Sequence, residues 1–452
     1  MSILIRKINL EKLYVIFSLI FGIAFVFSNG PFQSPDEYTH FRRAYQISDG
    51  NILGEKFHNK SGAFIPKSID DTVIKVSDGI PGNVDKKVNI NNLLEAFNMP
   101  LDSKNKIFIS SPNTLTYPPI AYIPQSIGIS FGKKLNLSPL ILMYLGRMFN
   151  LFFSCLVILL SMKIIPCKKN LIFLFALMPM VLYQSASLSA DGVTNCMAIF
   201  TVSYFMRLFS DNTKNIISKN IVTMFLLICI LSLTKGMYFL FSFLYLLIPK
   251  NKFKDKKQYF MIGLIIIITP LILNVIWSLL TTNTLATNSN ASVNGQINYI
   301  LHNPLSYIMI FFKTLIHNGT FYLKSFIGTL GWLDTDLPLL LTITYYILLI
   351  IAAIVNNEKR IFNFKSRVVF ICLFLSITTL IFTALYISYT PVGKYQIDGV
   401  QGRYLIPIAL LLILPLENLK IKIKRFNVIS VLYSLSVLIC TEYILINRYF
   451  IK

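Results

Sequence analysis

Long apolar runs separated by short basic segments dominate the sequence. Most of the runs are about 18 to 22 residues long, the length that an α-helix needs to cross a hydrocarbon core about 30 Å thick. They lie at about 12–28, 139–165, 170–188, 192–209, 220–248, 258–280, 338–355, 367–388, 403–417 and 427–446. This pattern predicts an all-α polytopic membrane protein.

The run 220–248 is too long for one span and too short for two full ones. Basic segments flank it on both sides, so the chain should cross the membrane twice within it. Its middle reads Thr234-Lys235-Gly236, and broken helices are tolerated in membranes where they line a cavity. We therefore expect two short helices with an outer turn at Lys235, and about eleven transmembrane helices in the whole bundle.

The composition agrees with this class of protein. Hydrophobic residues make up 54% of the 452 residues and charged residues only 14%, a balance that is rare in soluble domains. The net charge of +22 arises because Lys and Arg gather between the apolar runs, as the positive-inside rule requires. Anionic membrane lipids are the expected counter-charge, and nucleic acid is not an expected partner.

Basic residues also set the predicted topology. Arg6 and Lys7 precede the first run, which is interpreted as an uncleaved span with a cytoplasmic N-terminus. The C-terminus is then extracytoplasmic. Two long polar segments, 29–138 and 281–337, become extracytoplasmic loops, the first with juxtamembrane helices. The predicted units are therefore 1–28, 29–138, 139–280, 281–337 and 338–452.

The segment Ser34 to Arg43 carries the richest candidate chemistry. Ser34 and Glu37 are spaced as a capping box, with Pro35 at the first helical position. This purely structural interpretation does not need the other polar residues. On a helix, Asp36, His40 and Arg43 would share one face just outside the first span. We therefore predict Asp36 and Glu37 as catalytic carboxylates and His40 and Arg43 as substrate-binding residues.

Two ionisable residues lie inside or between apolar runs. Lys235 is either a wet turn residue or a cation that faces a cavity and binds phosphate. Asp191 either caps a span or presents its carboxylate to the same cavity.

Three further motifs lie in the outer loops. Tyr117 begins Tyr-Pro-Pro, for which a rigid turn is the favoured interpretation. Asp334 belongs to Gly-Trp-Leu-Asp-Thr-Asp, which is better explained as a turn before a span than as a metal-binding triplet. Gln401, Arg403 and Tyr404 open a span. There, Arg403 can either bind phosphate with its guanidinium or anchor the helix at the interface.

Several stretches together resemble the DUF2142 family of bacterial membrane proteins. The stretches that carry this resemblance are Pro35-Asp36-Glu37 with His40, Arg43, Ala44, Tyr45 and Gly50; Tyr117-Pro118-Pro119 with Pro124-Gln125; Leu145-Gly146-Arg147 with Asn150; Met178-Pro179 with Ser187 to Asp191; Lys235 with Tyr238; Gly331 to Asp334; and Gly399 to Tyr404. They span nearly the whole chain in order. Proline is common in the family where Asp336 stands here, so only Asp334 is carried over as a site residue.

That family is similar to the GT-C glycosyltransferases, and this resemblance implies the expected activity. Such enzymes take a sugar from a polyprenyl-phosphate carrier at the outer face of the membrane. They use an acidic residue of the first outer loop as base or metal ligand, and Asp36 occupies that position. The resemblance thus implies a GT-C-like bundle with a long first extracytoplasmic loop, located in the bacterial plasma membrane. Arg147 enters the candidate set by the same route.

The expected function is inverting transfer of a sugar from a polyprenyl-phosphate donor to a cell-envelope glycan, with Asp36 as general base. Asp36 and Glu37 could together hold a divalent cation; no other cofactor is indicated. One alternative is a transporter or flippase of lipid-linked glycans, which should show internal repeats and polar residues at mid-membrane depth. A membrane scaffold is the other alternative, and it would not need the Asp36 face.

Overall fold

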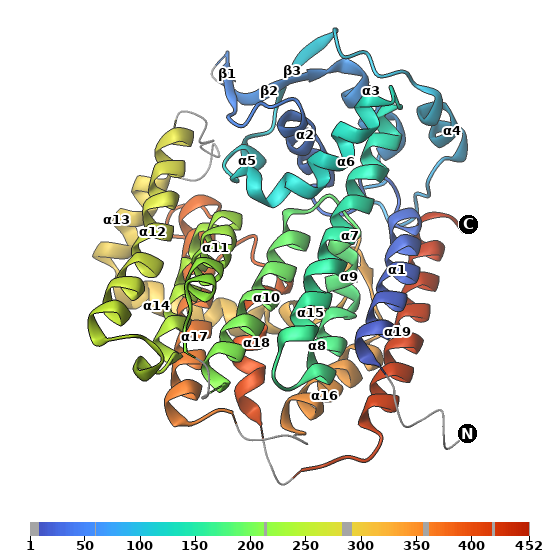
Figure 1. Ribbon diagram of the computed structural model, residues 1–452. Helices are drawn as coiled ribbons and strands as arrows, with labels where there is room; N and C mark the ends of the chain where they lie inside the picture. Colours follow the sequence, from blue (N-terminus) through green and yellow to red (C-terminus); the bar gives the residue numbers. More distant parts are fainter. Residues whose placement is uncertain are drawn as a thin grey trace.

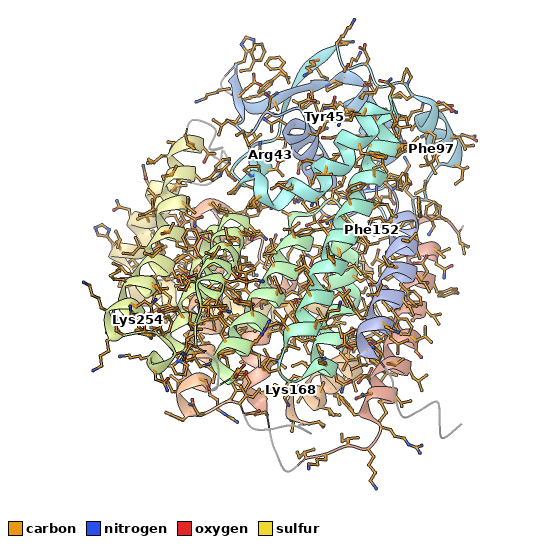
Figure 2. The ribbon with its side chains drawn as sticks, viewed as in Figure 1. Arg43, Tyr45, Phe97, Phe152, Lys168 and Lys254 are labelled. Atoms are coloured by element: carbon orange, nitrogen blue, oxygen red, sulfur yellow. The ribbon has the colours of Figure 1, made fainter. Side chains whose placement is uncertain are left out.

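The computed structural model describes residues 9–58, 60–211, 215–282, 292–355, 361–417 and 421–451. Arg6, Lys7 and the Asn-rich segment 283–291 lie outside these ranges. The protein consists of a helical bundle and a smaller cap that covers one end of it (Figure 1). Figure 2 shows Arg43 in the cap and Lys168 and Lys254 at the opposite, basic end of the bundle.

The bundle contains α-helices and 3-10 helices (η), most of which follow the predicted apolar runs. They are α1 (Leu10–Ser28), α7 (Pro139–Ile164), α8 (Lys169–Ala176), α9 (Pro179–Ser185), α10 (Ala190–Ser210), α11 (Ser218–Thr234), η3 (Gly236–Leu247), η4 (Lys250–Lys252), α12 (Lys256–Thr281), α13 (Val293–His302), α14 (Pro304–His317), α15 (Gly319–Ile327), α16 (Leu339–Ile354), α17 (Phe364–Ser388), η6 (Gly402–Leu405), α18 (Ile406–Ile413), η7 (Leu414–Leu416) and α19 (Phe426–Tyr449). The helices over 293–302, 304–317 and 319–327 instead lie in the segment 281–337, which was predicted as a loop. A two-stranded hairpin, β4 (Thr329–Leu330) and β5 (Thr335–Asp336), lies between α15 and α16.

Among the described residues, five helices are long and apolar enough to cross a membrane: α1, α7, α12, α17 and α19. Shorter apolar helices occupy the other runs, among them α11, η3 and α16. The predicted break at Lys235 is confirmed, since α11 ends at Thr234 and η3 begins at Gly236. The run 170–188 does not form one helix, because the chain leaves the helical conformation at Met178, before Pro179 begins α9.

The cap departs from the all-α expectation. It contains α2 (Glu37–Ser48), β1 (Glu55–Phe57), β2 (Lys60–Pro66), α3 (Lys67–Ser77), α4 (Ile90–Asn98), β3 (Lys106–Ser110), α5 (Pro112–Leu115), η2 (Pro119–Tyr122) and α6 (Ile123–Lys134). The strands form an antiparallel sheet in the order β1-β2-β3, with Gly62 opposite Ser110. Ser61, Ala63 and Ile65 alternate toward the buried face, as a half-buried strand requires.

Close helix packing joins the cap to the bundle. Helix α6 lies against α7, the second long helix. A Cβ atom on Gly128 would lie 2.6 Å from the backbone oxygen of Leu145, so the absence of a side chain permits this approach. Helix α1 begins at the basic end, and α19 ends beside the cap, where the backbone N–H of Val88 donates to the carbonyl of Tyr449 (2.8 Å).

Candidate functional site

Asp36 lies at the entrance to the first cap helix. Helix α2 begins at Glu37, and Asp36 immediately precedes it in a left-handed conformation (φ 58°) without capping the helix through its side chain. Only half of the predicted capping box forms. The backbone N–H of Ser34 donates to Oε2 of Glu37 (3.4 Å), but the Ser34 hydroxyl accepts a hydrogen bond from the Asn29 amide (3.0 Å). A left-handed conformation is uncommon for a residue other than glycine, and such backbone strain concentrates at functional sites.

Glu37 forms a closed ion pair with Arg147 of α7. Arg147 donates from Nε to Oε1 (2.8 Å) and from Nη2 to Oε2 (2.5 Å), and neither side chain has exposed surface. The backbone N–H of Leu188 also donates to Oε1 (3.0 Å). Arg147 further binds the carbonyls of Val26, Asn29 and Gly30.

This ion pair corrects two predictions. Glu37 has no free lone pairs directed toward solvent, so we do not assign it a catalytic role, and Arg147 positions the backbone rather than binding substrate. The adjacent carboxylates of Asp36 and Glu37 do not face each other as metal ligands, so they do not fit a shared divalent cation. Within the described ranges, no group of three or more His, Cys, Asp or Glu side chains has the spacing of a metal site.

The Asp36 carboxylate remains available for chemistry. The residue is exposed, and its carboxylate receives no hydrogen bond from the described part of the chain. Protein atoms nevertheless crowd the carboxylate, and this loss of water raises the pKa of Asp36 above its ordinary value, while the nearby Arg403 guanidinium opposes the rise. A carboxylate of this kind is a better proton acceptor than an ordinary aspartate.

The two cations of the site lie close to a second carboxylate, that of Asp191. Asp191, in the first turn of α10, lies 2.6 Å from the ammonium of Lys235 and 3.9 Å from Nη1 of Arg403. Gln184 donates to its other oxygen (3.0 Å). The structure thus places Lys235 at the cavity wall and pairs Asp191 with it, while Ser189 and not Asp191 caps α10.

The segment that opens α18 completes this cluster. Arg403 donates from Nε to the side-chain oxygen of Gln401 (2.6 Å). The ring centroid of Tyr404 lies 4.9 Å from the Lys235 ammonium and 5.4 Å from the Arg403 guanidinium. Aromatic faces stabilise cations at these distances, so Tyr404 helps to hold both of them at one place.

His40 lies near the charges of the site, whereas Arg43 binds the Tyr117 loop. A ring nitrogen of His40 lies 2.8 Å from the Tyr122 hydroxyl, and burial lowers the pKa of His40 to about 4. Arg43 is buried and donates to Gln46 and to the carbonyls of Ile52 and Tyr117. These hydrogen bonds anchor the Tyr117 loop, so we assign Arg43 a positioning role in place of the predicted substrate contact.

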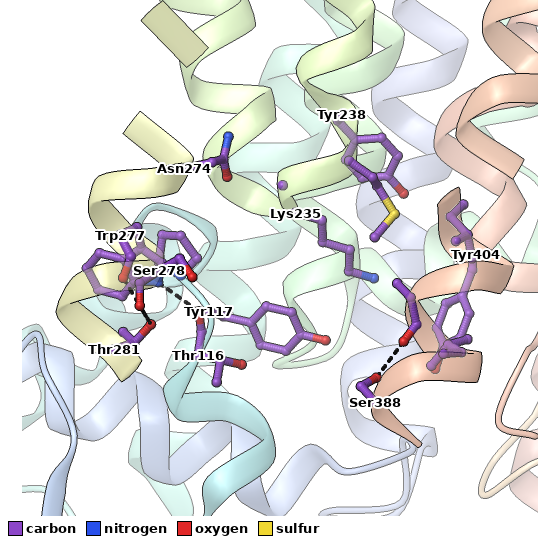
Figure 3. A pocket seen from close by; sticks show the side chains of 16 residues that line it. Thr116, Tyr117, Lys235, Tyr238, Asn274, Trp277, Ser278, Thr281, Ser388 and Tyr404 are labelled. Atoms are coloured by element: carbon purple, nitrogen blue, oxygen red, sulfur yellow. Dashed lines mark hydrogen bonds between the residues drawn. The ribbon is translucent and has the colours of Figure 1, made fainter. Parts of the chain in front are cut away.

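A cavity of about 480 Å³ lies beside the cation cluster. Figure 3 shows the side chains of Tyr117, Lys235 and Tyr404 directed into one space. Helix α12 supplies Asn274, Trp277, Ser278 and Thr281, and α17 supplies Ile381, Ala384, Leu385 and Ser388. Trp277 donates to the carbonyl of Thr116 (2.7 Å), which fixes the cap to this wall. One end of the cavity is therefore charged and the rest is largely apolar.

Asp334 lies outside this cluster. It pairs with Arg448 of α19 (2.9 Å), and Thr335 donates to its other oxygen (2.9 Å). These contacts give Asp334 a structural role in the turn before α16, and we do not include it in the candidate site. The favoured interpretation of Tyr117 as only a turn is incomplete, because its ring lines the cavity.

Sequence reasoning missed several residues around the site. Trp277 and Asn274 lie in an apolar run without a motif. Tyr38 lies near Asp36 and stacks with Trp332, a contact between distant segments that no sequence pattern indicates. The pairing of Lys235 with Asp191 did have a signal, because two opposite charges in apolar segments each need a partner.

Fold and site together define a membrane-embedded helical protein with a charged site beneath a cap. A family model described as a predicted membrane protein, DUF2142, matches residues 19–412, so the chain belongs to that family. Searches of the curated proteins and of the solved structures gave no match.

Proposed function

We propose that the protein is a glycosyltransferase that moves a sugar from a polyprenyl-phosphate carrier to a glycan of the bacterial cell envelope. The observation that carries the proposal is one juxtaposition. An exposed carboxylate with a raised pKa, Asp36, lies near Arg403, which approaches the same Asp191 that binds Lys235 at the end of an apolar cavity. A GT-C-type enzyme needs such a base and such a place for a lipid phosphate.

The cavity suits a donor that is polar at one end and apolar along its length. Lys235, Arg403 and Asp191 together carry one net positive charge at the polar end, before the nearby Asp36 carboxylate is counted. A phosphate placed there would neutralise that charge and accept hydrogen bonds from the guanidinium. The aliphatic side chains of α17 and the ring of Trp277 would contact the prenyl chain, and much of α12 is exposed, as lipid contact requires.

The proposed reaction inverts the anomeric centre. The acceptor hydroxyl attacks the anomeric carbon on the face opposite the phosphate, and Asp36 takes its proton. A new carbon–oxygen bond forms to the acceptor, and the bond from the anomeric carbon to the phosphate oxygen breaks. Arg403 and Lys235 stabilise the charge that grows on the leaving phosphate. No group changes its oxidation state, so the step needs no oxidant or reductant.

The distribution of charge supports an extracytoplasmic site. Lys168 and Lys254 lie at the end of the bundle opposite the cap (Figure 2). The positive-inside rule places such an end in the cytoplasm. Asp36, at the cap end, then faces outward, where lipid-linked sugars are presented.

The main rival, a flippase of lipid-linked glycans, makes a different prediction in vesicles. We would reconstitute the purified protein in proteoliposomes with radiolabelled undecaprenyl-phosphate sugars and oligosaccharide acceptors. The proposal predicts labelled oligosaccharide and free undecaprenyl phosphate. Movement of the intact donor between leaflets without cleavage would instead establish the flippase and overturn the proposal.

A further inference from the structure

An aromatic pair beside Asp36 is not used by the proposed donor site. The rings of Tyr38 and Trp332 lie with their centroids 5.8 Å apart and their planes 17° from parallel. Both residues are partly exposed, and neither belongs to the wall of the donor cavity. Tyr38 lies only two residues after Asp36. Large ring surfaces next to a reactive carboxylate are positioned to contact whatever approaches it.

Charged side chains lie next to the aromatic pair. The Arg42 guanidinium lies 5.2 Å from the centroid of the Tyr38 ring. Arg42 also forms an ion pair with Asp70 of α3. A ligand on the Tyr38 ring would therefore meet both hydrogen-bond donors and acceptors at this edge, with little net charge.

The loop that carries Trp332 is fixed relative to Asp36. The indole N–H donates to the carbonyl of Phe32 (3.2 Å), and the backbone N–H of Gly331 donates to the Tyr183 hydroxyl (3.2 Å). Tyr183 in turn donates to Asn29 (3.0 Å), in the segment that leads to Asp36. Leu333, next to Trp332, has a left-handed backbone (φ 64°), a costly conformation for leucine. This strained turn directs the indole toward α2.

We propose that Tyr38 and Trp332, with Arg42 and Asp70 at their edge, form the acceptor subsite and bind a pyranose ring of a glycan. The inference rests on the proposed function and adds the class of acceptor. A pyranose has apolar C–H faces that pack on aromatic rings, and hydroxyls that bond to guanidinium and carboxylate groups. A neutral or weakly charged sugar fits this surface better than a phosphate, because Arg42 is already paired with Asp70.

The two tryptophans of the chain make the two subsites separately observable. Trp277 lines the donor cavity and Trp332 belongs to the aromatic pair. In Trp277→Phe the tryptophan fluorescence comes from Trp332 alone, and in Trp332→Phe it comes from Trp277 alone. We would titrate both purified, detergent-solubilised variants with chitotriose, maltotriose and mannotriose, and separately with farnesyl phosphate.

The proposal predicts that at least one oligosaccharide changes the emission of Trp332 but not that of Trp277, and that farnesyl phosphate does the reverse. Adding Tyr38→Ala to Trp277→Phe should weaken the oligosaccharide affinity by about three- to tenfold, the range for loss of one aromatic stacking contact. Tyr38→Phe keeps the ring and should retain the affinity.

Two results would show whether the acceptor subsite or the donor assignment is wrong. If farnesyl phosphate changes Trp277 while no oligosaccharide changes Trp332, the acceptor subsite is wrong and the donor assignment stands. If an oligosaccharide changes Trp332 while farnesyl phosphate leaves Trp277 unchanged, the subsite stands and the donor assignment fails. If no oligosaccharide changes the emission of Trp332 and farnesyl phosphate does not change that of Trp277 in folded protein, both the acceptor subsite and the donor assignment are wrong.

Discussion

The ammonium of Lys235 lies 2.6 Å from Oδ1 of Asp191, although the two residues come from separate apolar segments of the chain. An isolated charge at either position would be costly, because neither segment offers water to it. The pair therefore fixes the turn between α11 and η3 against the first turn of α10. It also keeps a cation at the end of the cavity, close to Arg403.

Replacement of Lys235 tests the role of this cation in phosphate binding. Lys235→Gln should weaken the binding of farnesyl phosphate by about tenfold or more, because a charged hydrogen bond contributes about 1.5 to 3 kcal/mol. Lys254→Gln is the matched control, since Lys254 is exposed at the basic end. Calorimetric titration gives both affinities. Equal affinities for the two variants would remove Lys235 from the donor site.

The Glu37–Arg147 pair should matter for stability rather than for catalysis. Glu37→Gln leaves a buried guanidinium without its charge partner, which typically costs about 3 to 5 kcal/mol. We expect a lower midpoint of thermal unfolding in detergent, while Glu95→Gln, at an exposed position in the cap, should leave it unchanged.

The double variant Glu37→Leu with Arg147→Met supplies the decisive comparison. It removes both charges together and should recover the part of the loss that comes from the unpaired guanidinium. The backbone groups that the pair had bound remain without partners, so the midpoint should stay below that of the wild type. If instead Glu37→Gln unfolds at the wild-type temperature yet loses transfer activity, Glu37 is a catalytic group after all.

The raised pKa of Asp36 predicts how the rate of sugar transfer falls at acidic pH. A general base acts only when it is deprotonated, so transfer should fall as the pH drops through a pKa that lies above the ordinary aspartate value of 3.8. Arg403 lowers this pKa, so Arg403→Gln should move the acidic limb to higher pH as well as slow the reaction. A limb that does not move in this variant would contradict the proximity of the two charges in the working enzyme.

The lowered pKa of His40 predicts how the free energy of unfolding depends on pH. Burial lowers its pKa from 6.5 to about 4 in the folded protein, so between these values the unfolded chain binds more protons. The free energy of unfolding should therefore fall as the pH drops from about 6.5 to about 4. His40→Asn, which keeps a polar group near Tyr122, should reduce this slope in thermal unfolding at several pH values. An unchanged slope would place the responsible group elsewhere.

Most of the helical bundle could be predicted from sequence because a long buried helix appears as an apolar run of known length. Helices α13, α14 and α15 were not predicted, because polar residues interrupt the segment 281–337. Even the unusual break at Lys235 was visible, since basic segments on both sides demanded two helices. The cap sheet was not visible. Its strands are three to seven residues long, and Phe64 and Phe108 on the outer face hide the alternation with polar residues.

The site was predictable only in part, for a physical reason. A motif shows which residues are neighbours along the chain, but not which of them the fold buries. Asp36 and Glu37 are adjacent, yet one is exposed and the other is closed in an ion pair with Arg147. Contacts such as Asp191 with Lys235, or Tyr38 with Trp332, depend on how distant helices and loops pack together.

The most direct test of the central claim compares the sugar-transfer rates of wild-type protein and Asp36→Asn in proteoliposomes, with Asp85→Asn as an exposed control in the same cap. The account predicts a loss of at least about 100-fold in transfer for Asp36→Asn, with unchanged thermal stability and farnesyl phosphate binding, and full activity for Asp85→Asn. Transfer by Asp36→Asn at the wild-type rate would contradict it.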